Sequence, residues 1–245
     1  GVAEDGRRRR AGMSAAASRS MMPKLVLFDC DGTLVDSQHM IVATMTDAFA
    51  KVGHAPPDRA GVLSIIGLSL PEAVGRLDAN LDAVSVGLVV DAYRDIYQTM
   101  KFRLAETAPL YPGALDALQA LANRDDVLLG IVTGKSRRGL DAILETHGLS
   151  TMFSVLRTAD DGPSKPHPFM VVDAVAALGG DVSQTVVVGD TGYDMLMARA
   201  AGAFALGVTW GYNGRDELTQ AGAQVLAEGF AEVPALAIGL LGARE

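Results

Sequence analysis

Asp29 and Asp31, two aspartates separated by one residue, are the side chains of this sequence best placed to do chemistry. They directly follow the apolar run of residues 24–28, which predicts a buried strand. Open α/β sheets bind ligands at the C-terminal ends of their strands. An extended segment sends both carboxylates to the same face, and the chain then turns at Gly32. One carboxylate can attack an electrophile while the other moves a proton, and both can approach one divalent cation.

Two further motifs offer groups that can hold a phosphate. Thr133 and Gly134 follow a predicted strand at residues 127–132, so a hydroxyl and backbone N–H groups can face an anion at the start of the next helix. Lys165 lies directly before a proline, which favours an extended backbone at the lysine. Its ammonium group can neutralise both an attacking carboxylate and a phosphate.

Two more carboxylates follow the apolar run of residues 185–188. Asp190 lies at the end of this predicted strand, and Asp194 lies four residues later at the start of a predicted helix. This spacing places both at the same sheet edge as the first pair. An ordinary loop with Asp194 as the helix N-cap is the alternative.

The segments that carry these residues predict an α/β protein. Apolar residues keep helical spacing through residues 38–106, with no convincing strand. Helices and strands then alternate, which predicts a Rossmann-like parallel sheet with helices on both faces. Because the first strand precedes the helical block, the block is an insertion. We therefore expect three parts: an N-terminal extension at 1–21, a core formed by 22–37 and 107–245, and an all-helical cap at 38–106.

Amino-acid composition limits the partners and the cellular location that we expect. The chain has 245 residues, of which 49% are hydrophobic, and a net charge of −8, so we expect no nucleic-acid partner. No apolar run reaches the roughly 18 residues of a membrane span, so we expect no membrane partner. Cys30 is the single cysteine, which suits a reducing compartment, and we expect a cytoplasmic protein. Residues 1–21 carry five arginines and lack apolar periodicity, and we expect them to be disordered.

Taken in order, the four motifs resemble those of phosphatases in the haloacid dehalogenase superfamily. The resemblance covers about residues 23–230, and the helical insertion resembles the small helical cap of that superfamily. Within the group, the chain is similar to phosphoglycolate phosphatase-like proteins. Residues 66–70 resemble their cap loop, and residues 111–113 resemble the return of the chain into the core.

The resemblance implies roles for the first pair of aspartates. Asp29 would attack phosphorus and form an aspartyl-phosphate. Asp31 would protonate the leaving alcohol and then deprotonate the hydrolytic water. Dehalogenases of the superfamily lack the second aspartate, so Asp31 argues against that activity. Cys30 between them is expected to point into the core, and no arginine-containing phosphate loop follows it, which disfavours a cysteine nucleophile.

The resemblance also implies a Mg²⁺ cofactor. Asp29, the backbone carbonyl of Asp31 and Asp190 would hold the ion, and Asp194 would bind a metal-bound water or orient Lys165. Clustered carboxylates repel one another and a phosphate dianion, so a divalent cation and a lysine are needed. Three groups from the motifs would bind the substrate phosphate: Thr133, Gly134 and Lys165.

The expected function is that of a Mg²⁺-dependent phosphatase acting on a small phosphorylated metabolite, with phosphoglycolate as the first candidate. A phosphomutase resembling beta-phosphoglucomutase retains all these residues and stays open. A non-catalytic phosphate-binding regulator is the alternative from another class, although none of the motif residues is lost. The sequence leaves open the substrate and whether the protein is a monomer or a homodimer.

Overall fold

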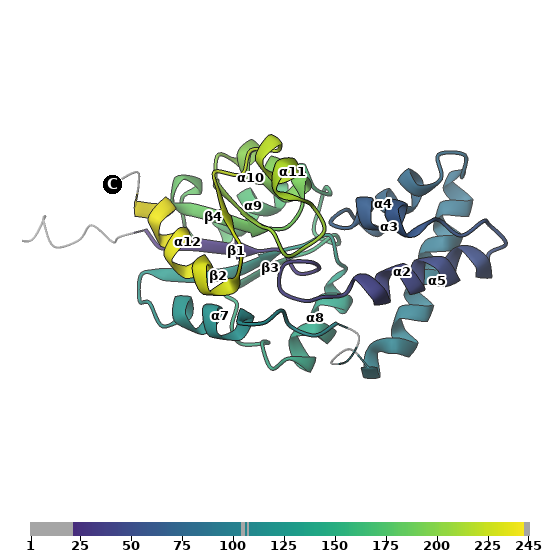
Figure 1. Cartoon of the computed structure of the whole chain (residues 1–245), viewed down its shortest axis with the longest axis horizontal. Helices are drawn as coiled ribbons and strands as arrows, with labels where there is room; N and C mark the ends of the chain where they lie inside the picture. Colours follow the sequence, from purple (N-terminus) through teal and green to yellow (C-terminus); the bar gives the residue numbers. More distant parts are fainter. Residues whose placement is uncertain (1–21, 104–105, 107, 243–245) are drawn as a thin grey trace, which may run out of the picture.

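A computed structural model describes residues 22–103, 106 and 108–242 (Figure 1). Its centre is a parallel sheet of six strands in the order β3-β2-β1-β4-β5-β6, which confirms the predicted fold class. The strands are β1 (Lys24–Phe28), β2 (Val127–Val132), β3 (Val155–Arg157), β4 (Thr185–Gly189), β5 (Phe204–Val208) and β6 (Val225–Ala227). β3 begins two residues later than the predicted strand at 153–156, and β6 was not predicted.

Six helices cover the two faces of the sheet. They are α7 (Ala114–Ala122), α8 (Arg137–Thr146), α9 (Phe169–Ala177), α10 (Gly192–Ala201), α11 (Arg215–Gln220) and α12 (Val233–Gly242). Alternate residues of β1 reach opposite faces, as the period of two in a strand requires. Val26 and Phe28 join the core formed with α7, α8 and α12, whereas Leu25 and Leu27 join the core formed with α9, α10 and α11.

The helices α2 (Gln38–Lys51), α3 (Arg59–Ile65), α4 (Leu70–Leu77) and α5 (Ala83–Met100) lie between β1 and β2 in the chain. In Figure 1 they form a separate body beside the C-terminal ends of the strands. This insertion has its own apolar core, which includes Met45, Phe49, Val62, Val74 and Val89. The remaining short segments are 3₁₀ turns at Lys101–Arg103, Val182–Gln184 and Phe230–Glu232.

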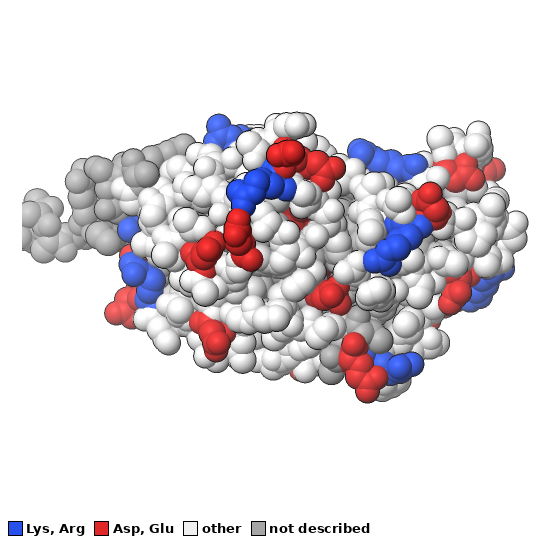
Figure 2. Space-filling view, in the orientation of Figure 1, with Lys and Arg blue, Asp and Glu red and all other residues white. Residues whose placement is uncertain are grey.

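Polar contacts join the insertion to the α/β part. The backbone N–H of Ser69 donates to Ser164 Oγ at 2.8 Å, and Tyr193 Oη donates to the carbonyl of Ser64 at 3.2 Å. Both contacts lie beside motif loops, so the insertion rests on the sheet edge that carries the predicted site. The face shown in Figure 2 carries interspersed acidic and basic side chains. Within the described part of the chain, no helix combines the length and apolar character of a membrane span.

The expected N-terminal extension at residues 1–21 lies outside the described residues.

Candidate active site

The strand order brings the first, second and fourth motifs together. β1 lies between β2 and β4, so Asp29 is flanked by Thr133 on one side and Asp190 on the other. The backbone continues the ladder one residue past the strands, with Asp29 N–H donating to the carbonyl of Val188 at 2.9 Å. The three side chains therefore start from fixed backbone positions at the C-terminal edge of the sheet.

Lys165 joins this group from the loop before α9. Its Nζ lies 2.8 Å from Asp29 Oδ1 and 2.6 Å from Asp194 Oδ1, and all three side chains are buried. One ammonium group thus neutralises part of two carboxylates. The structure thus brings Lys165 next to the first and fourth motifs.

Asp190 is held rigidly by two donors. Thr33 Oγ1 donates to its Oδ1 at 2.8 Å, and the backbone N–H of Tyr212 donates to its Oδ2 at 2.9 Å. The turn after β1 must pass close to this carboxylate. Gly32 has φ +86°, and a Cβ there would lie 2.5 Å from the Tyr212 ring, so only glycine fits.

Asp194 is not the N-cap of α10, which corrects the alternative raised from the sequence. The helix begins two residues earlier, at Gly192, with Thr191 as its N-cap. Asp194 Oδ2 accepts hydrogen bonds from the N–H and Oγ1 of Thr191, at 3.1 and 2.7 Å. Its Oδ1 accepts the hydrogen bond from Lys165. Both carboxylate oxygens therefore have partners.

The site suits a divalent cation. Asp29, Asp190 and Asp194 each offer one carboxylate oxygen, and these oxygens lie within 4.8 Å of one another. Both oxygens of Asp29 are buried; Oδ1 is paired with Lys165, whereas Oδ2 has no hydrogen-bond partner among the described residues. Unsatisfied buried carboxylate oxygens are costly unless they are paired or bind a metal. Such an all-oxygen donor set is what Mg²⁺ prefers.

Electrostatics lead to the same conclusion. Burial raises the pKa of Asp29 to about 7, an effect opposed by Lys165 and reinforced by Asp194 and Asp31. Burial, Asp194 and Asp29 raise the pKa of Asp190 well above its ordinary value. Burial disfavours the charged form of Lys165, but Asp194 and Asp29 outweigh it, so its pKa is raised. Ionised together, the carboxylates would carry more negative charge than one lysine offsets, and an added cation would favour their ionised forms.

Asp31 lies apart from the three clustered carboxylates and has its own partners. Ser37 Oγ donates to its Oδ1 at 2.6 Å, and Lys135 Nζ lies 2.9 Å from its Oδ2. The predicted metal contact of Asp31 is through its backbone carbonyl, so this carboxylate stays available for another task. Cys30 is buried in the core beneath it, and burial raises the pKa of its thiol, which disfavours a nucleophilic thiolate.

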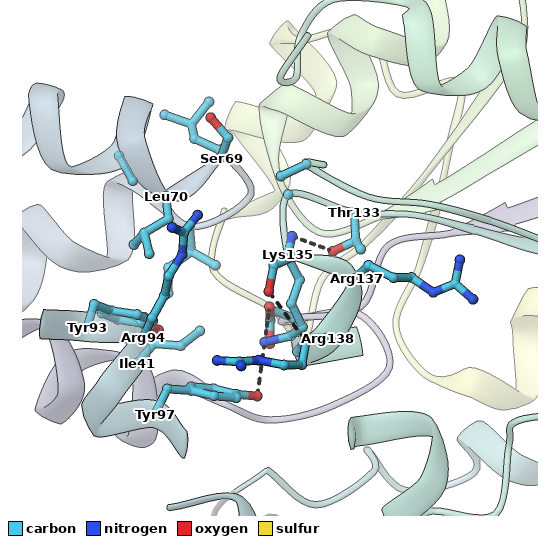
Figure 3. Close-up of a pocket in the computed structure, with 18 of the residues that line it drawn as sticks. Ile41, Ser69, Leu70, Tyr93, Arg94, Tyr97, Thr133, Lys135, Arg137 and Arg138 are labelled. Carbon is cyan, nitrogen blue, oxygen red and sulfur yellow. Dashed lines mark hydrogen bonds and ion pairs between the residues drawn. The ribbon is translucent and has the colours of Figure 1, made fainter. Parts of the chain in front are cut away.

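A cavity of about 720 Å³ opens between the insertion and the sheet edge. Asp29, Asp31, Thr133 and Gly134 line it from the α/β part. Figure 3 shows side chains of the insertion on the opposite wall, among them Ile41, Leu70, Tyr93, Arg94 and Tyr97. Lys165, Asp190 and Asp194 are buried and do not line the cavity. Their charges can still act on a substrate in the cavity.

The sequence reasoning missed three residues around Asp31. Ser37 and Lys135 bind its two carboxylate oxygens, and Tyr97 contacts Lys135 from the insertion. The position of Lys135 directly after Thr133-Gly134 was a usable signal, because it starts from the same strand end. Tyr97 carried no such signal, since its spacing in a helix is that of a core residue.

The fold and the site thus define a Rossmann-like hydrolase with carboxylates at the C-terminal edge of its sheet. A family model for haloacid dehalogenase-like hydrolases matches residues 26–208. The chain belongs to this family, and the resemblance noted from its motifs is confirmed.

Relatives and a solved structure agree with this assignment. The chain is 37% identical over 223 residues to "Probable phosphatase IndB" of Dickeya dadantii, covering 90% of this chain and 96% of that protein. It is 32% identical to a phosphoglycolate phosphatase of Caulobacter vibrioides, over 88% of this chain and 91% of that one. A solved structure described as a predicted phosphoglycolate phosphatase from Haemophilus somnus superposes with a TM-score of 0.78 at 25% identity, covering 89% and 99% of the two chains. The prediction of an enzyme of the phosphatase type is confirmed.

Proposed function

We propose that the protein is a Mg²⁺-dependent phosphatase that hydrolyses a small phosphorylated metabolite, with phosphoglycolate as the first candidate. The observation that carries this proposal is the state of Asp29. Its carboxylate lines the cavity, pairs with Lys165 through Oδ1 and leaves Oδ2 without a hydrogen-bond partner among the described residues. A nucleophile needs such a lone pair that no hydrogen bond occupies.

In the proposed reaction, an oxygen of Asp29 attacks phosphorus, and the bond from phosphorus to the leaving oxygen breaks. Asp31 gives its proton to that oxygen, so the product leaves as a neutral alcohol. Asp31 then takes a proton from a water molecule, which attacks the aspartyl-phosphate. This second step releases inorganic phosphate, restores the Asp29 carboxylate and returns the proton to Asp31.

Thr133, Gly134 and Lys165 would hold or neutralise the phosphate. Thr133 is buried at the end of β2, and its Oγ1 accepts from the Lys135 backbone N–H at 3.3 Å, which leaves its hydroxyl proton free to donate. The backbone N–H of Gly134 lies beside it. Lys165 would offset charge from behind Asp29, because it does not reach the cavity.

Asp29, Asp190 and the backbone carbonyl of Asp31 would hold Mg²⁺, with Asp194 orienting Lys165. A bound Mg²⁺ would neutralise charge on the carboxylates and on the phosphate oxygens. The Lys165–Asp194 distance of 2.6 Å supports the orienting role of Asp194.

We propose that residues 38–106 act as a cap over a core made of residues 22–37 and 107–245. The two approach each other closely at Gly134, where an added Cβ would lie 2.5 Å from the carbonyl oxygen of Leu68. The cap loop thus touches the phosphate-binding turn directly. Substrate choice would reside in this loop and in the cap side chains that line the cavity. We further propose a cytoplasmic location, as the single buried cysteine suits.

A panel of phosphorylated metabolites, assayed with Mg²⁺ for both released phosphate and isomerised product, tests the proposal. We expect phosphate release, with phosphoglycolate among the accepted substrates, and no release by Asp29→Asn. Isomerised product without phosphate would instead identify a phosphomutase. Tight phosphate binding with no turnover of any compound would indicate a regulator.

A further inference from the structure

Lys135 is a largely buried cation at the cavity wall that the proposed mechanism does not use. Only 8% of its side chain is exposed, and its Nζ lies 2.9 Å from Asp31 Oδ2. On its other side, Nζ lies 3.5 Å from Tyr97 Oη and 5.1 Å from the centre of the Tyr97 ring. Figure 3 shows Lys135 placed between the turn that carries Thr133 and the insertion helix that carries Tyr97.

The two oxygens of Asp31 are held from different sides. Ser37, which binds Oδ1, is fully buried and does not line the cavity, whereas Lys135, which binds Oδ2, does. The Oδ2 side of the Asp31 carboxyl group is therefore held by a residue of the cavity wall, and the Oδ1 side by a residue of the interior. Removing Lys135 would leave Ser37 as the one side chain holding this carboxyl group among the described residues.

The contact with Tyr97 fixes Lys135 in turn. A lysine side chain has high rotamer entropy, and an ammonium group facing a tyrosine ring and hydroxyl is attracted to both. Tyr97 stacks on Tyr93 with ring centres 6.2 Å apart, so its ring is supported within α5. The chain of contacts runs from the insertion through Lys135 to the general acid.

We propose that Lys135 is a positioning residue, which orients the Asp31 carboxyl group toward the leaving-group oxygen and is itself placed by Tyr97 of the insertion. This inference rests on the proposed phosphatase function. In the step concerned, the proton on Asp31 moves to the leaving oxygen as its bond to phosphorus breaks. Lys135 takes no proton and forms no bond to the substrate. Its contribution is the direction in which Asp31 points.

The test compares Lys135→Met and Lys135→Arg on an alkyl phosphate and on an aryl phosphate such as p-nitrophenyl phosphate. An alkyl leaving group needs the proton, whereas a nitrophenolate does not. For Lys135→Met we expect kcat on the alkyl substrate to fall by up to about a hundredfold, as misplaced catalytic groups do, with KM little changed. The first turnover of the aryl substrate should stay near wild type and appear as a burst. Lys135→Arg should recover most of the alkyl activity.

Tyr97 and an unrelated lysine complete the design. Tyr97→Phe removes the hydroxyl but keeps the ring under the ammonium group and should show a small alkyl-selective loss, whereas Tyr97→Leu removes both contacts and should show a larger one. Lys51→Met is the matched control, because Lys51 forms an exposed ion pair with Asp95 at 3.5 Å. It should leave both activities and the melting temperature unchanged.

Equal losses in the first turnover of alkyl and aryl substrates, a change in KM alone, or no loss in Lys135→Met would overturn the inference. A change in KM alone would mean that Lys135 binds the substrate. A crystal structure of Lys135→Met gives a readout independent of turnover. We expect the Asp31 carboxyl group to leave its observed orientation, and an unchanged orientation would also overturn the inference. If the wild-type enzyme released no phosphate from any substrate, the proposed function would be refuted instead. The crystal structure of Lys135→Met would still test the orientation of Asp31, so the two failures can be told apart.

Discussion

Lys165 and Asp29 form an ion pair inside the protein, with Nζ 2.8 Å from Oδ1 and both side chains at most 1% exposed. The same ammonium group also binds Asp194, and Asp190 lies within the same cluster. Lys165 therefore offsets only part of the buried negative charge. This imbalance explains why the cluster suits a cation, and it adds to burial, the larger cause, in raising the pKa values of Asp29 and Asp190.

Lys165→Met should damage the site and the fold together. Removing one partner of a buried ion pair typically costs about 3–5 kcal/mol of unfolding free energy. We also expect kcat to fall by at least about a hundredfold, the usual cost of losing one group that stabilises transition-state charge. Chemical denaturation and steady-state kinetics measure the two effects, with Lys51→Met as the control. If Lys165→Met kept the stability and turnover of the wild type, the ion pair would be needed neither for the fold nor for catalysis.

Activity should require Mg²⁺, and excess Ca²⁺ should inhibit. Both ions accept oxygen ligands, but Ca²⁺ takes more of them and can bind both oxygens of one carboxylate. Binding both oxygens of Asp29 would remove the lone pair that attacks. A titration of phosphate release with each ion, after chelation, measures this. Full activity in chelator or with Ca²⁺ alone would contradict the metal assignment.

The stability of the metal-free protein should fall as pH rises. Asp29 has an ordinary pKa of 3.8, and burial first of all raises this pKa to about 7 in the folded state. Between these values the folded protein holds a proton that the unfolded chain has lost, so stabilisation present below about pH 4 is lost as pH rises toward 7. Asp29→Asn removes this titration, and its stability relative to wild type should increase over the same window.

Denaturation of both proteins in chelator at several pH values tests this expectation. Because Mg²⁺ and the proton compete for Asp29, added Mg²⁺ should raise the melting temperature of the wild type more at pH 8 than at pH 5. A stability difference between the two proteins that does not change with pH would show that Asp29 titrates normally.

Gly134→Ala should weaken the contact between the insertion and the phosphate-binding turn. The added Cβ would lie 2.5 Å from the Leu68 carbonyl oxygen, so one of the two backbones must move. We expect lower kcat/KM and a lower melting temperature. Gly87→Ala in α5 is the matched control, since its Cβ meets nothing within 4 Å. It should raise stability by roughly 0.5–1 kcal/mol, as alanine does in a helix. If both variants changed kcat/KM and the melting temperature in the same way, the close approach to Leu68 could not be the cause of the effect of Gly134→Ala.

The α/β architecture was predictable because the strands at 24–28, 127–132 and 185–188 are short apolar runs in a chain where helices and strands alternate. Because such strands are parallel, their C-terminal ends lie at one edge of the sheet. Asp29, Thr133 and Asp190 could therefore be predicted to lie at that edge although no distance was known. The weaker signals lay at the C-terminal end, where β6 is only three residues long and its pattern could not be told from a loop.

The partners of Asp31 show where sequence reasoning ends. In the sequence, Ser37 lies six residues from Asp31 and Lys135 lies more than a hundred residues from it. Their distances from Asp31 in space depend on how the chain turns after β1 and β2. Tyr97 depends further on how the insertion sits over the sheet. Motif spacing carries no information on that contact. The start of α10 was placed two residues late because Thr191 competes with Asp194 as a cap.

The covalent role of Asp29 is the central claim, and trapping the intermediate tests it most directly. Asp31→Asn keeps the nucleophile but slows hydrolysis of the intermediate, because proton transfer is worth about 10²–10⁴-fold. Mixed rapidly with a labelled aryl phosphate and quenched in acid, this variant should release a burst of phenol. Its label should map to Asp29, and the double variant that also carries Asp29→Asn should show neither burst nor label. A label on another residue, or full turnover in Asp29→Asn, would contradict the account.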